Sequence, residues 1–439
     1  MMQSNPKPQR EPNSSDKKRK PAVAVFLSLI SIGLGQIYNG ELAKGLVLKV
    51  IVGLGISLFV LSNYLSSNTL FFLSVFVIMF VVLKAYSVVQ AYRKSHEIGS
   101  SYTLRQFNRS SVYILLTVIF LALSVILPVV IARAALMDIS AHHPFRSPKA
   151  MELYLRSYDK RAEEWPVRSE TWLVETSFGQ TFVRISGPVD APPLVLLPGA
   201  SATSLLWAPN IEDLSLFYRA YALDNIYDVG RSVFTQKFKT PGDFTSWLDE
   251  LFTALGLGDN INLMGLSYGG WLASQYAVRF PGRLHRVVLL APASTVLPLT
   301  SEWALRALVC LIPHRHFSKS FMYWLMEDLV NADEAGRTAL EEVVDNAFLG
   351  LQCFKPKMLV SPTVLSDEEW RSLKVPTLYL VGENEKIYSP QAAVQRLKRV
   401  APQIIAELIP DAGHDLTVVQ AETINKRVLE FLGSCDHQK

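Results

Sequence analysis

The motif Gly265-Leu266-Ser267-Tyr268-Gly269 constrains the fold of this chain more than any other feature of its sequence. It directly follows the apolar run Ile261 to Met264 and precedes a stretch typical of a helix, Trp271 to Ala277. A serine at the end of a strand, with glycines two residues to either side, forms a nucleophile elbow. The sharp turn strains the serine backbone, and the glycines leave room for the turn and the next helix. Ser267 is therefore the candidate nucleophile.

Two later apolar runs, 376–382 and 404–409, predict buried strands that each end near a residue able to assist a serine. The first run leads into Glu383 and Glu385, which offer carboxylates, and the second leads to His414, which offers an imidazole. Serine, acid and histidine in this chain order, each just past a strand, are expected of one particular α/β fold.

Residues from about 166 to 435 resemble alpha/beta-hydrolases of the esterase, lipase and C–C hydrolase kind. The resemblance rests on several blocks and a closing helix. They are the strand ending in Pro198-Gly199-Ala200, the block Asp228-Val229-Gly230-Arg231-Ser232, the elbow, Gly382 to Glu385, Gly413-His414, and Ala421 to Leu432. The resemblance implies an α/β fold, a hydrolase-type sheet with a helical lid.

The resemblance also implies a role for each matched residue. Ser267 attacks an acyl carbon, His414 removes the serine proton and later gives it to the leaving alcohol, and Glu385 orients the imidazole. The backbone N–H groups of Tyr268 and Ala200 would form the oxyanion hole. Water then releases the acyl group.

Two positions depart from the family pattern. Pro198-Gly199 stands where many members have His-Gly, but the oxyanion donor is the backbone of the next residue, so Ala200 can still serve. The acid is usually Asp, whereas the matching residue here is Glu385, a longer carboxylate. Glu383 is the alternative acid.

The expected sheet has eight strands, and the expected lid lies between the sixth and the seventh, at about 295–370. The predicted strands are 173–176, 182–186, 194–197, 218–223, 261–266, 286–290, 377–381 and 404–409. No metal or organic cofactor is expected, since the three cysteines are far apart and no Cys/His cluster has metal-ligand spacing.

The first third of the chain predicts a membrane module. Mean hydropathy over the whole chain is +0.21, and the excess is concentrated in apolar segments at about 22–38, 46–62, 69–91 and 112–133, of which the last two are long enough to span a bilayer. We expect a disordered basic tail over 1–20, a transmembrane module of three or four apolar helices over 21–133, and a connector over 134–165. Met151 to Tyr158 would form a short helix along the membrane surface. A cleaved signal is the rival interpretation of the first segment.

The stretch Ile32 to Gly45 resembles a motif of small bacterial membrane modules with a Gly-x-Gly-Gln-x-Tyr-x-Gly core, here Gly33 to Gly40. Glycines and a glutamine in apolar surroundings suit a tight helix–helix contact or a re-entrant turn. The apolar part before Gln36 is short for a full span, which favours a re-entrant or interfacial segment.

Basic clusters predict the orientation of this module. Lys17 to Lys20 and the group Arg93, Lys94, Arg105 and Arg109 both favour the cytoplasmic side, which requires an even number of crossings between them. The first segment would then not cross, and the last span would carry the hydrolase out of the cytoplasm. Arg133, Arg146 and Lys149 oppose this orientation, and four full spans would keep the domain inside.

The sequence thus predicts a multi-pass cell-membrane protein with a serine hydrolase domain acting on carboxylic esters. A small-molecule or lipid-like ester and the lipid bilayer are its expected partners, and nucleic acid is not. The same residues would support amide or C–C bond hydrolysis or cofactor-free haloperoxidase chemistry. A non-catalytic membrane receptor or scaffold that retained the fold is a further alternative.

Overall fold

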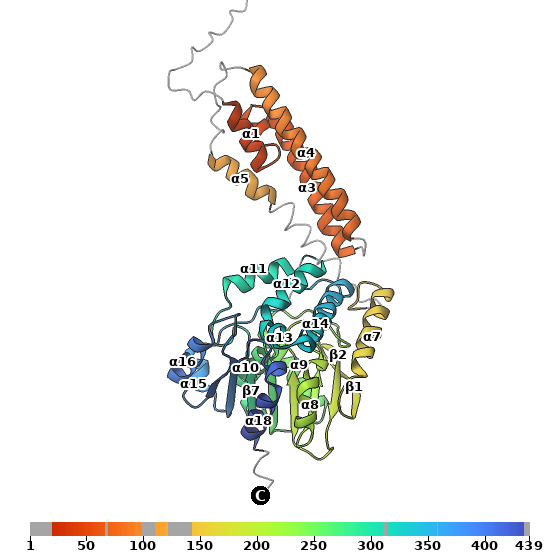
Figure 1. The fold of residues 1–439 in the computed structure, drawn as a ribbon, viewed down its shortest axis with the longest axis vertical. Coiled ribbons are helices and arrows are strands. Elements are labelled where there is room, and N and C mark those ends of the chain that lie inside the picture. Colours follow the sequence, from red (N-terminus) through yellow and green to blue (C-terminus); the bar gives the residue numbers. More distant parts are fainter. Residues whose placement is uncertain are drawn as a thin grey trace, which may run out of the picture. The chain divides into compact units, whose positions relative to one another are not determined.

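A computed structural model describes residues 20–65, 69–98, 110–121, 143–310, 312, 314–357 and 359–433. The chain divides into two compact units, Met1–Asp138 and Ile139–Lys439 (Figure 1). Most of the basic tail predicted over 1–20 lies outside the described residues.

The second unit is built on one sheet with the order β1-β2-β4-β3-β6-β7-β8-β9, and β5 pairs with β2. β1 and β2 are antiparallel to their neighbours, whereas the strands from β4 to β9 along this order are parallel. The strands are β1 Ser169–Thr176, β2 Gly179–Ser186, β3 Pro193–Leu197, β4 Arg219–Leu223, β5 Val233–Phe234, β6 Ile261–Leu266, β7 Leu284–Leu290, β8 Thr377–Gly382 and β9 Ile405–Ile409. All eight predicted strands are present, and β5 is an addition.

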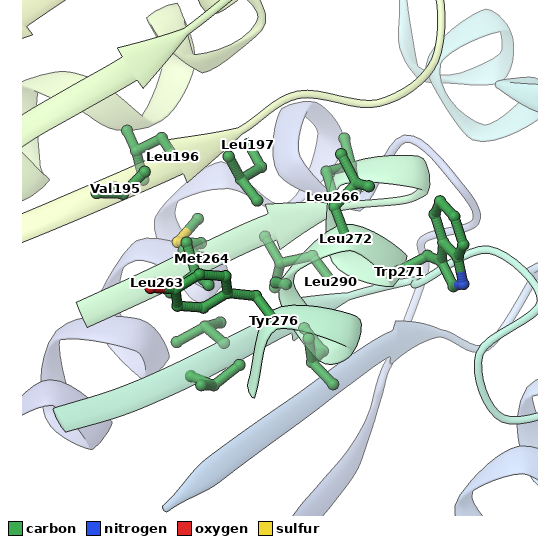
Figure 2. Packing of buried hydrophobic residues seen from close by; sticks show 14 of the residues in the cluster. Val195, Leu196, Leu197, Leu263, Met264, Leu266, Trp271, Leu272, Tyr276 and Leu290 are labelled. Carbon is green, nitrogen blue, oxygen red and sulfur yellow. The ribbon is translucent and has the colours of Figure 1, made fainter. Parts of the chain in front are cut away.

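The central strands β3, β6, β7 and β8 are mostly apolar and buried because helices cover both faces of a parallel sheet. Figure 2 shows side chains of β3, β6 and β7 close to those of α10 (Tyr268–Arg279), among them Leu272 and Tyr276. Leu263, Leu290 and Tyr276 are fully buried in this core. The packing fixes the start of α10 against the end of β6, and so fixes the elbow between them.

Other helices flank the sheet, and α9 (Pro241–Ala254) shows the clearest start signal. It has a capping box between Thr240 and Asp243 and proline in its first turn. The remaining elements outside the lid are η3 Ser204–Trp207, α8 Ala208–Ser215, η4 Pro281–Arg283, α16 Pro390–Val400, α17 Leu416–Val419 and α18 Ala421–Leu432. α18 confirms the predicted closing helix.

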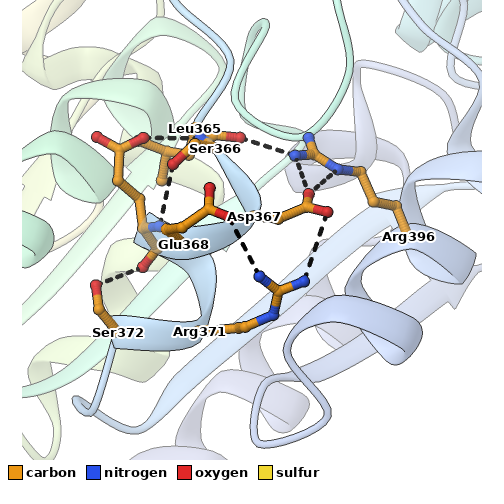
Figure 3. A network of polar contacts seen from close by, with 8 residues as sticks. Leu365, Ser366, Asp367, Glu368, Arg371, Ser372 and Arg396 are labelled. Atoms are coloured by element: carbon orange, nitrogen blue, oxygen red, sulfur yellow. Dashed lines mark hydrogen bonds and ion pairs between the residues drawn. The ribbon is translucent and has the colours of Figure 1, made fainter.

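The insertion between β7 and β8 is helical, as predicted for the lid. It contains α11 Ser301–Cys310, α12 Arg315–Leu325, α13 Glu327–Ala332, α14 Glu334–Cys353 and α15 Asp367–Ser372. Its last helix is fastened to α16, because Arg396 donates to Asp367 Oδ1 at 2.6 Å and to the Leu365 carbonyl at 2.9 Å (Figure 3). The end of the insertion is therefore held against α16.

The segment expected to be a connector contains α7 (Pro148–Ala162), which packs into the second unit. Tyr154 and Tyr158 are buried beside Phe182 and Phe354, and the Tyr158 hydroxyl donates to Asp224 at 3.2 Å. We expected a short helix along the membrane surface here, whereas α7 packs with its two tyrosines inside the second unit. The two tyrosines, one helical turn apart, form an apolar face that the many charges of this segment had obscured.

The first unit is helical, with α1 Pro21–Ile30, α2 Leu34–Tyr38, α3 Leu42–Leu65, α4 Thr69–Ile98 and α5 Ser110–Leu121. Within the described part of the chain, one helical stretch, Phe76–Ile98, is long and apolar enough to cross a membrane, and two shorter apolar helices accompany it. Most of the fourth apolar segment, predicted over 112–133, lies outside the described residues.

The glycine-rich motif of this unit forms a tight turn against α4. Gly33 has φ of 90°, and a Cβ there would lie 2.3 Å from the carbonyl oxygen of Gly45. Gln36 Nε2 donates to the Ser87 carbonyl at 2.7 Å, and the Ser87 hydroxyl donates to Gln36 Oε1 at 3.1 Å. The glycines thus allow a close helix contact, and the glutamine satisfies buried polar groups.

Candidate active site

Ser267 lies at the turn between β6 and α10 with φ of 54° and ψ of −116°. This backbone conformation is strained for a residue with a side chain, as expected of a nucleophile elbow. The flanking glycines have a steric reason, because a Cβ at Gly265 would lie 2.2 Å from the Gly269 carbonyl oxygen, and one at Gly269 would lie 2.2 Å from the Leu197 carbonyl oxygen.

The turn after β3 lies directly beside this serine. A Cβ at Gly199 would lie 3.4 Å from Ser267 Cβ and 4.0 Å from its Oγ. Hydrogen bonds hold the elbow from the other side, since the Ser267 N–H donates to the Leu290 carbonyl at 2.9 Å and the Ala293 N–H donates to the Ser267 carbonyl at 3.0 Å. The serine is thus fixed between the ends of three neighbouring strands.

The two expected oxyanion donors are the backbone amides of Ala200 and Tyr268. Ala200 is exposed in the turn beside the serine, and Tyr268 begins α10, where an N–H has no partner within the helix. Neither amide donates to another residue of the described chain. The Tyr268 hydroxyl donates to the Val360 carbonyl at 2.9 Å, which fixes this residue against the insertion.

The structure brings Glu385, and not Glu383, to the histidine. Glu385 Oε2 lies 2.8 Å from His414 Nδ1, and the Glu385 side chain is completely buried. The other oxygen, Oε1, accepts from the N–H groups of Lys386 at 2.8 Å and Ile387 at 3.0 Å. Because a carboxylate only accepts, Nδ1 carries the proton and Nε2 is left as the acceptor. Glu383 is exposed.

Burial disfavours the charged form of His414, but the charge of Glu385 and its hydrogen bond to the imidazole outweigh burial. Asp415 adds to their effect, so the pKa of His414 is raised above its ordinary value. The side chain is only 10% exposed. The pair can therefore stabilise an imidazolium away from water.

Helix α13 of the insertion contacts both catalytic loops, which the sequence analysis did not predict. Asp415 Oδ2 accepts from the Leu329 N–H at 2.8 Å, and Asp328 Oδ1 accepts from Asn384 Nδ2 at 2.9 Å. The only sequence signal was an aspartate directly after His414. Among the described residues, no group of three or more His, Cys, Asp or Glu side chains could hold a metal ion.

The chain belongs to the Alpha/beta hydrolase family, whose sequence model matches residues 194–427. The uncharacterized carboxylesterase nap of Bacillus subtilis (strain 168) is 36% identical over 288 residues, which cover 64% of this chain and 92% of that protein. Carboxylesterase YbfK of the same strain is 33% identical over 279 residues, covering 64% and 93%.

Solved structures similar to this chain are of the same kind of enzyme as these relatives. The crystal structure of naproxen esterase (carboxylesterase NP) from Bacillus subtilis has a TM-score of 0.60 and 36% identity, over 65% of this chain and 99% of that one. That of carboxylesterase CesB (YbfK) has a TM-score of 0.59 and 32% identity, over 65% and 99%. The protein is an enzyme, a serine hydrolase of carboxylesterase type.

Proposed function

We propose that this enzyme hydrolyses carboxylic esters with Ser267 as nucleophile, His414 as base and Glu385 as the acid of the triad. The observation that carries the proposal is the buried 2.8 Å contact between Glu385 and His414. The loops bearing them follow β8 and β9, and the elbow follows β6, so all three residues come from the carboxyl ends of parallel strands. In such sheets ligands bind at that edge.

The reaction follows from these positions. Nε2 of His414 takes the hydroxyl proton as Ser267 Oγ attacks the ester carbonyl carbon, and the amides of Ala200 and Tyr268 donate to the oxyanion. The intermediate collapses to an acyl-serine and the alcohol leaves with the proton from His414. A water molecule, deprotonated by the same imidazole, then attacks the acyl carbon and releases the carboxylic acid.

The substrate we propose is a small ester with an apolar or lipid-like acyl group. Two relatives are named carboxylesterases, which supports ester over amide or C–C bond hydrolysis. We propose the apolar acyl group from the apolar character of the lid, whose Trp303, Trp324 and Leu325 are partly buried and pack against the core of the domain. A panel of p-nitrophenyl esters of increasing chain length, run beside matching anilides, distinguishes ester from amide hydrolysis and measures the preferred acyl length.

The decisive test of the triad is Ser267→Ala. We expect no ester turnover and no labelling by a fluorophosphonate probe, with an unchanged melting temperature, because alanine removes only the nucleophilic oxygen. Ser274→Ala, about two turns further along α10, is the matched control and should keep both ester turnover and probe labelling. Turnover near the wild-type rate in Ser267→Ala would refute the assignment.

We further propose that the first unit anchors the enzyme in the cell membrane. Large apolar side chains are exposed on several of its helices, more than a water-soluble surface normally carries. They include Phe26, Leu29 and Ile30 of α1, Val47, Val50 and Leu54 of α3, Ile78, Val81 and Val82 of α4, and Ile114, Leu115 and Val118 of α5.

The contacts within this unit support three crossings. The Lys20 N–H donates to the Tyr38 hydroxyl at 3.0 Å, so the segment 20–38 begins and ends at one level and would form a re-entrant hairpin. Lys44 and Gln90 meet at 3.5 Å near the start of α3 and the end of α4, as expected for two antiparallel crossings.

The third crossing would be the apolar segment predicted over 112–133, and α5 is the described start of it. Its Tyr113 packs with Tyr38 and Ala91, whereas Phe120 packs further along, beside Leu48 and Val52. α5 therefore starts at the end of the unit where the basic residues lie and runs parallel to α3. The basic end of this unit is expected in the cytoplasm. Three crossings from there lead the chain to the outer side, where the catalytic domain would lie.

Protease treatment of intact cells tests this orientation. We expect protease added outside to release a soluble, ester-hydrolysing fragment from cells that produce the full chain. Protection in intact cells, followed by release after lysis, would place the catalytic domain in the cytoplasm. Full-length protein in the soluble fraction of lysed cells would refute the anchor itself.

A further inference from the structure

The turn that carries Ala200 is held by a carboxylate from another loop. Asp228 Oδ2 accepts from the Ser201 N–H at 2.8 Å, and its Oδ1 accepts from the Val229 N–H at 2.8 Å. Ser201 has φ of 59°, the left-handed region that residues with a side chain rarely adopt. The hydrogen bond to Asp228 therefore fixes a strained residue directly after the expected oxyanion donor.

A lysine from the insertion holds Asp228 in turn. Lys357, which follows α14, donates from Nζ to the Asp228 carbonyl oxygen at 2.6 Å. Its ammonium lies 5.8, 5.3 and 5.2 Å from the ring centroids of Tyr227, Phe234 and Phe354, respectively. Asp228 is only 4% exposed. The ammonium thus supplies a positive charge to a carboxylate that burial removes from water.

The pKa values of Lys357 and Asp228 indicate that each charge depends on the other. Burial lowers the pKa of Lys357 to about 8, and the charge of Asp228 opposes that change. Burial likewise raises the pKa of Asp228, and the charge of Lys357 and the two backbone N–H groups oppose it. Each group therefore helps to keep the other one charged.

We propose that Asp228 and Lys357 are positioning residues for the oxyanion turn, through which the insertion orients the Ala200 N–H toward the acyl oxygen at Ser267. The inference rests on the proposed triad and oxyanion hole. It gives a role to the block Asp228 to Ser232, which the triad does not use, and to a stretch of the insertion outside its helices. Lys357 acts through Asp228 and Ser201, and it does not touch the reacting atoms.

A shift of the turn would act on the transition state more than on substrate binding. The oxyanion forms only as the serine attacks, and removing a donor of this kind lowers kcat by about 10²- to 10³-fold. Misplacing such a donor should cost less than removing it. We therefore expect Lys357→Met to lower kcat about 10- to 100-fold with KM within about twofold of wild type.

The test compares Lys357→Met with Lys374→Met, which replaces an exposed lysine that precedes β8. Methionine keeps the packing against the three rings and removes the charge. The measurements are kcat and KM for one p-nitrophenyl ester, melting temperature, and inhibition by a trifluoromethyl ketone that forms an oxyanion on the serine. Inhibitor affinity should fall in proportion to kcat/KM in Lys357→Met and stay unchanged in Lys374→Met.

Asp228→Asn is the second variant, because its amide group would face one of the two backbone N–H donors. It should lower kcat at least as much as Lys357→Met, again without raising KM. A wild-type kcat in Lys357→Met would overturn the inference, and so would a raised KM with kcat unchanged. Ser267→Ala, assayed in parallel, separates the two ideas: an active Ser267→Ala refutes the triad, whereas an inactive one beside a wild-type Lys357→Met refutes only the positioning role.

Discussion

Replacing Glu385 by glutamine tests whether this carboxylate keeps the proton of the His414 imidazole on Nδ1. Oε1 of Glu385 accepts from two backbone N–H groups, those of Lys386 and Ile387, at 2.8 and 3.0 Å. These donors require an oxygen, so the amide nitrogen of the new glutamine must point toward His414 Nδ1. An NH2 group can only donate, which forces Nδ1 to accept and moves the imidazole proton to Nε2. The histidine then presents a proton to Ser267 and cannot remove one.

The expected loss is large because the Glu385 side chain is completely buried and water cannot replace its charge. The equivalent Asp→Asn change in serine proteases lowers kcat about 10⁴-fold through the same tautomer error. At 1.36 kcal/mol for each factor of ten, this corresponds to about 5 kcal/mol of transition-state stabilisation. We expect a fall of about 10³- to 10⁴-fold here, with little change in KM or in melting temperature, since the glutamine keeps the hydrogen bonds at Oε1.

The assay is steady-state hydrolysis of one p-nitrophenyl ester, with Glu383→Gln as the matched control. Glu383 is exposed two residues upstream, so the same substitution there should leave kcat within about twofold of wild type. A larger loss in Glu383→Gln than in Glu385→Gln would move the acid to Glu383. Equal, small losses in both would show that the buried pair does not take part in catalysis.

Two further predictions follow. The kcat/KM of the wild type should decline as pH falls through a value above about 6.5. The neutral imidazole is the active form, and although burial disfavours the imidazolium, Glu385 and Asp415 favour it. Asp415→Asn should move this decline to lower pH, and a wild-type decline well below 6.5 would contradict the argument. A fragment starting at Pro166 lacks α7, including the buried Tyr154 and Tyr158. It should melt more than about 10 °C below one starting at Ile139, and equal melting temperatures would show that α7 is dispensable.

The sheet could be predicted from the sequence because buried parallel strands are continuous apolar runs, and those runs end at residues with recognisable chemistry. β6 ends at the elbow, β8 ends before Glu385, and β9 ends before His414. Each of these signals is local, since a few adjacent residues contain it. The preference for Glu385 over Glu383 came from the resemblance, and burial of Glu385 is consistent with it.

The contacts that were missed join residues far apart in the chain. α7 was hidden because its charged surface dominates its composition, whereas its two buried tyrosines matter only once Phe182 and Phe354 are beside them. Lys357 and Asp228 are 129 residues apart, and neither has a neighbour in sequence that indicates the pairing. Such partners depend on the path of the insertion over the sheet, which hydrophobic periodicity does not describe.

These long-range contacts limit how the insertion can move. α13 donates and accepts hydrogen bonds at both catalytic loops, through Leu329 with Asp415 and through Asp328 with Asn384, and Lys357 adds a third attachment at Asp228. The bond of Leu329 to Asp415 is buried and that of Lys357 to Asp228 is partly buried, whereas that of Asn384 to Asp328 is exposed. Each buried polar group left without its partner costs about 1–3 kcal/mol. Swinging the whole insertion away would therefore cost several kcal/mol and would also disturb the groups that perform the reaction. In contrast, α12 makes its ion pairs with α14 of the same insertion, through Arg315 with Glu341, so α11 and α12 can shift without breaking those three attachments.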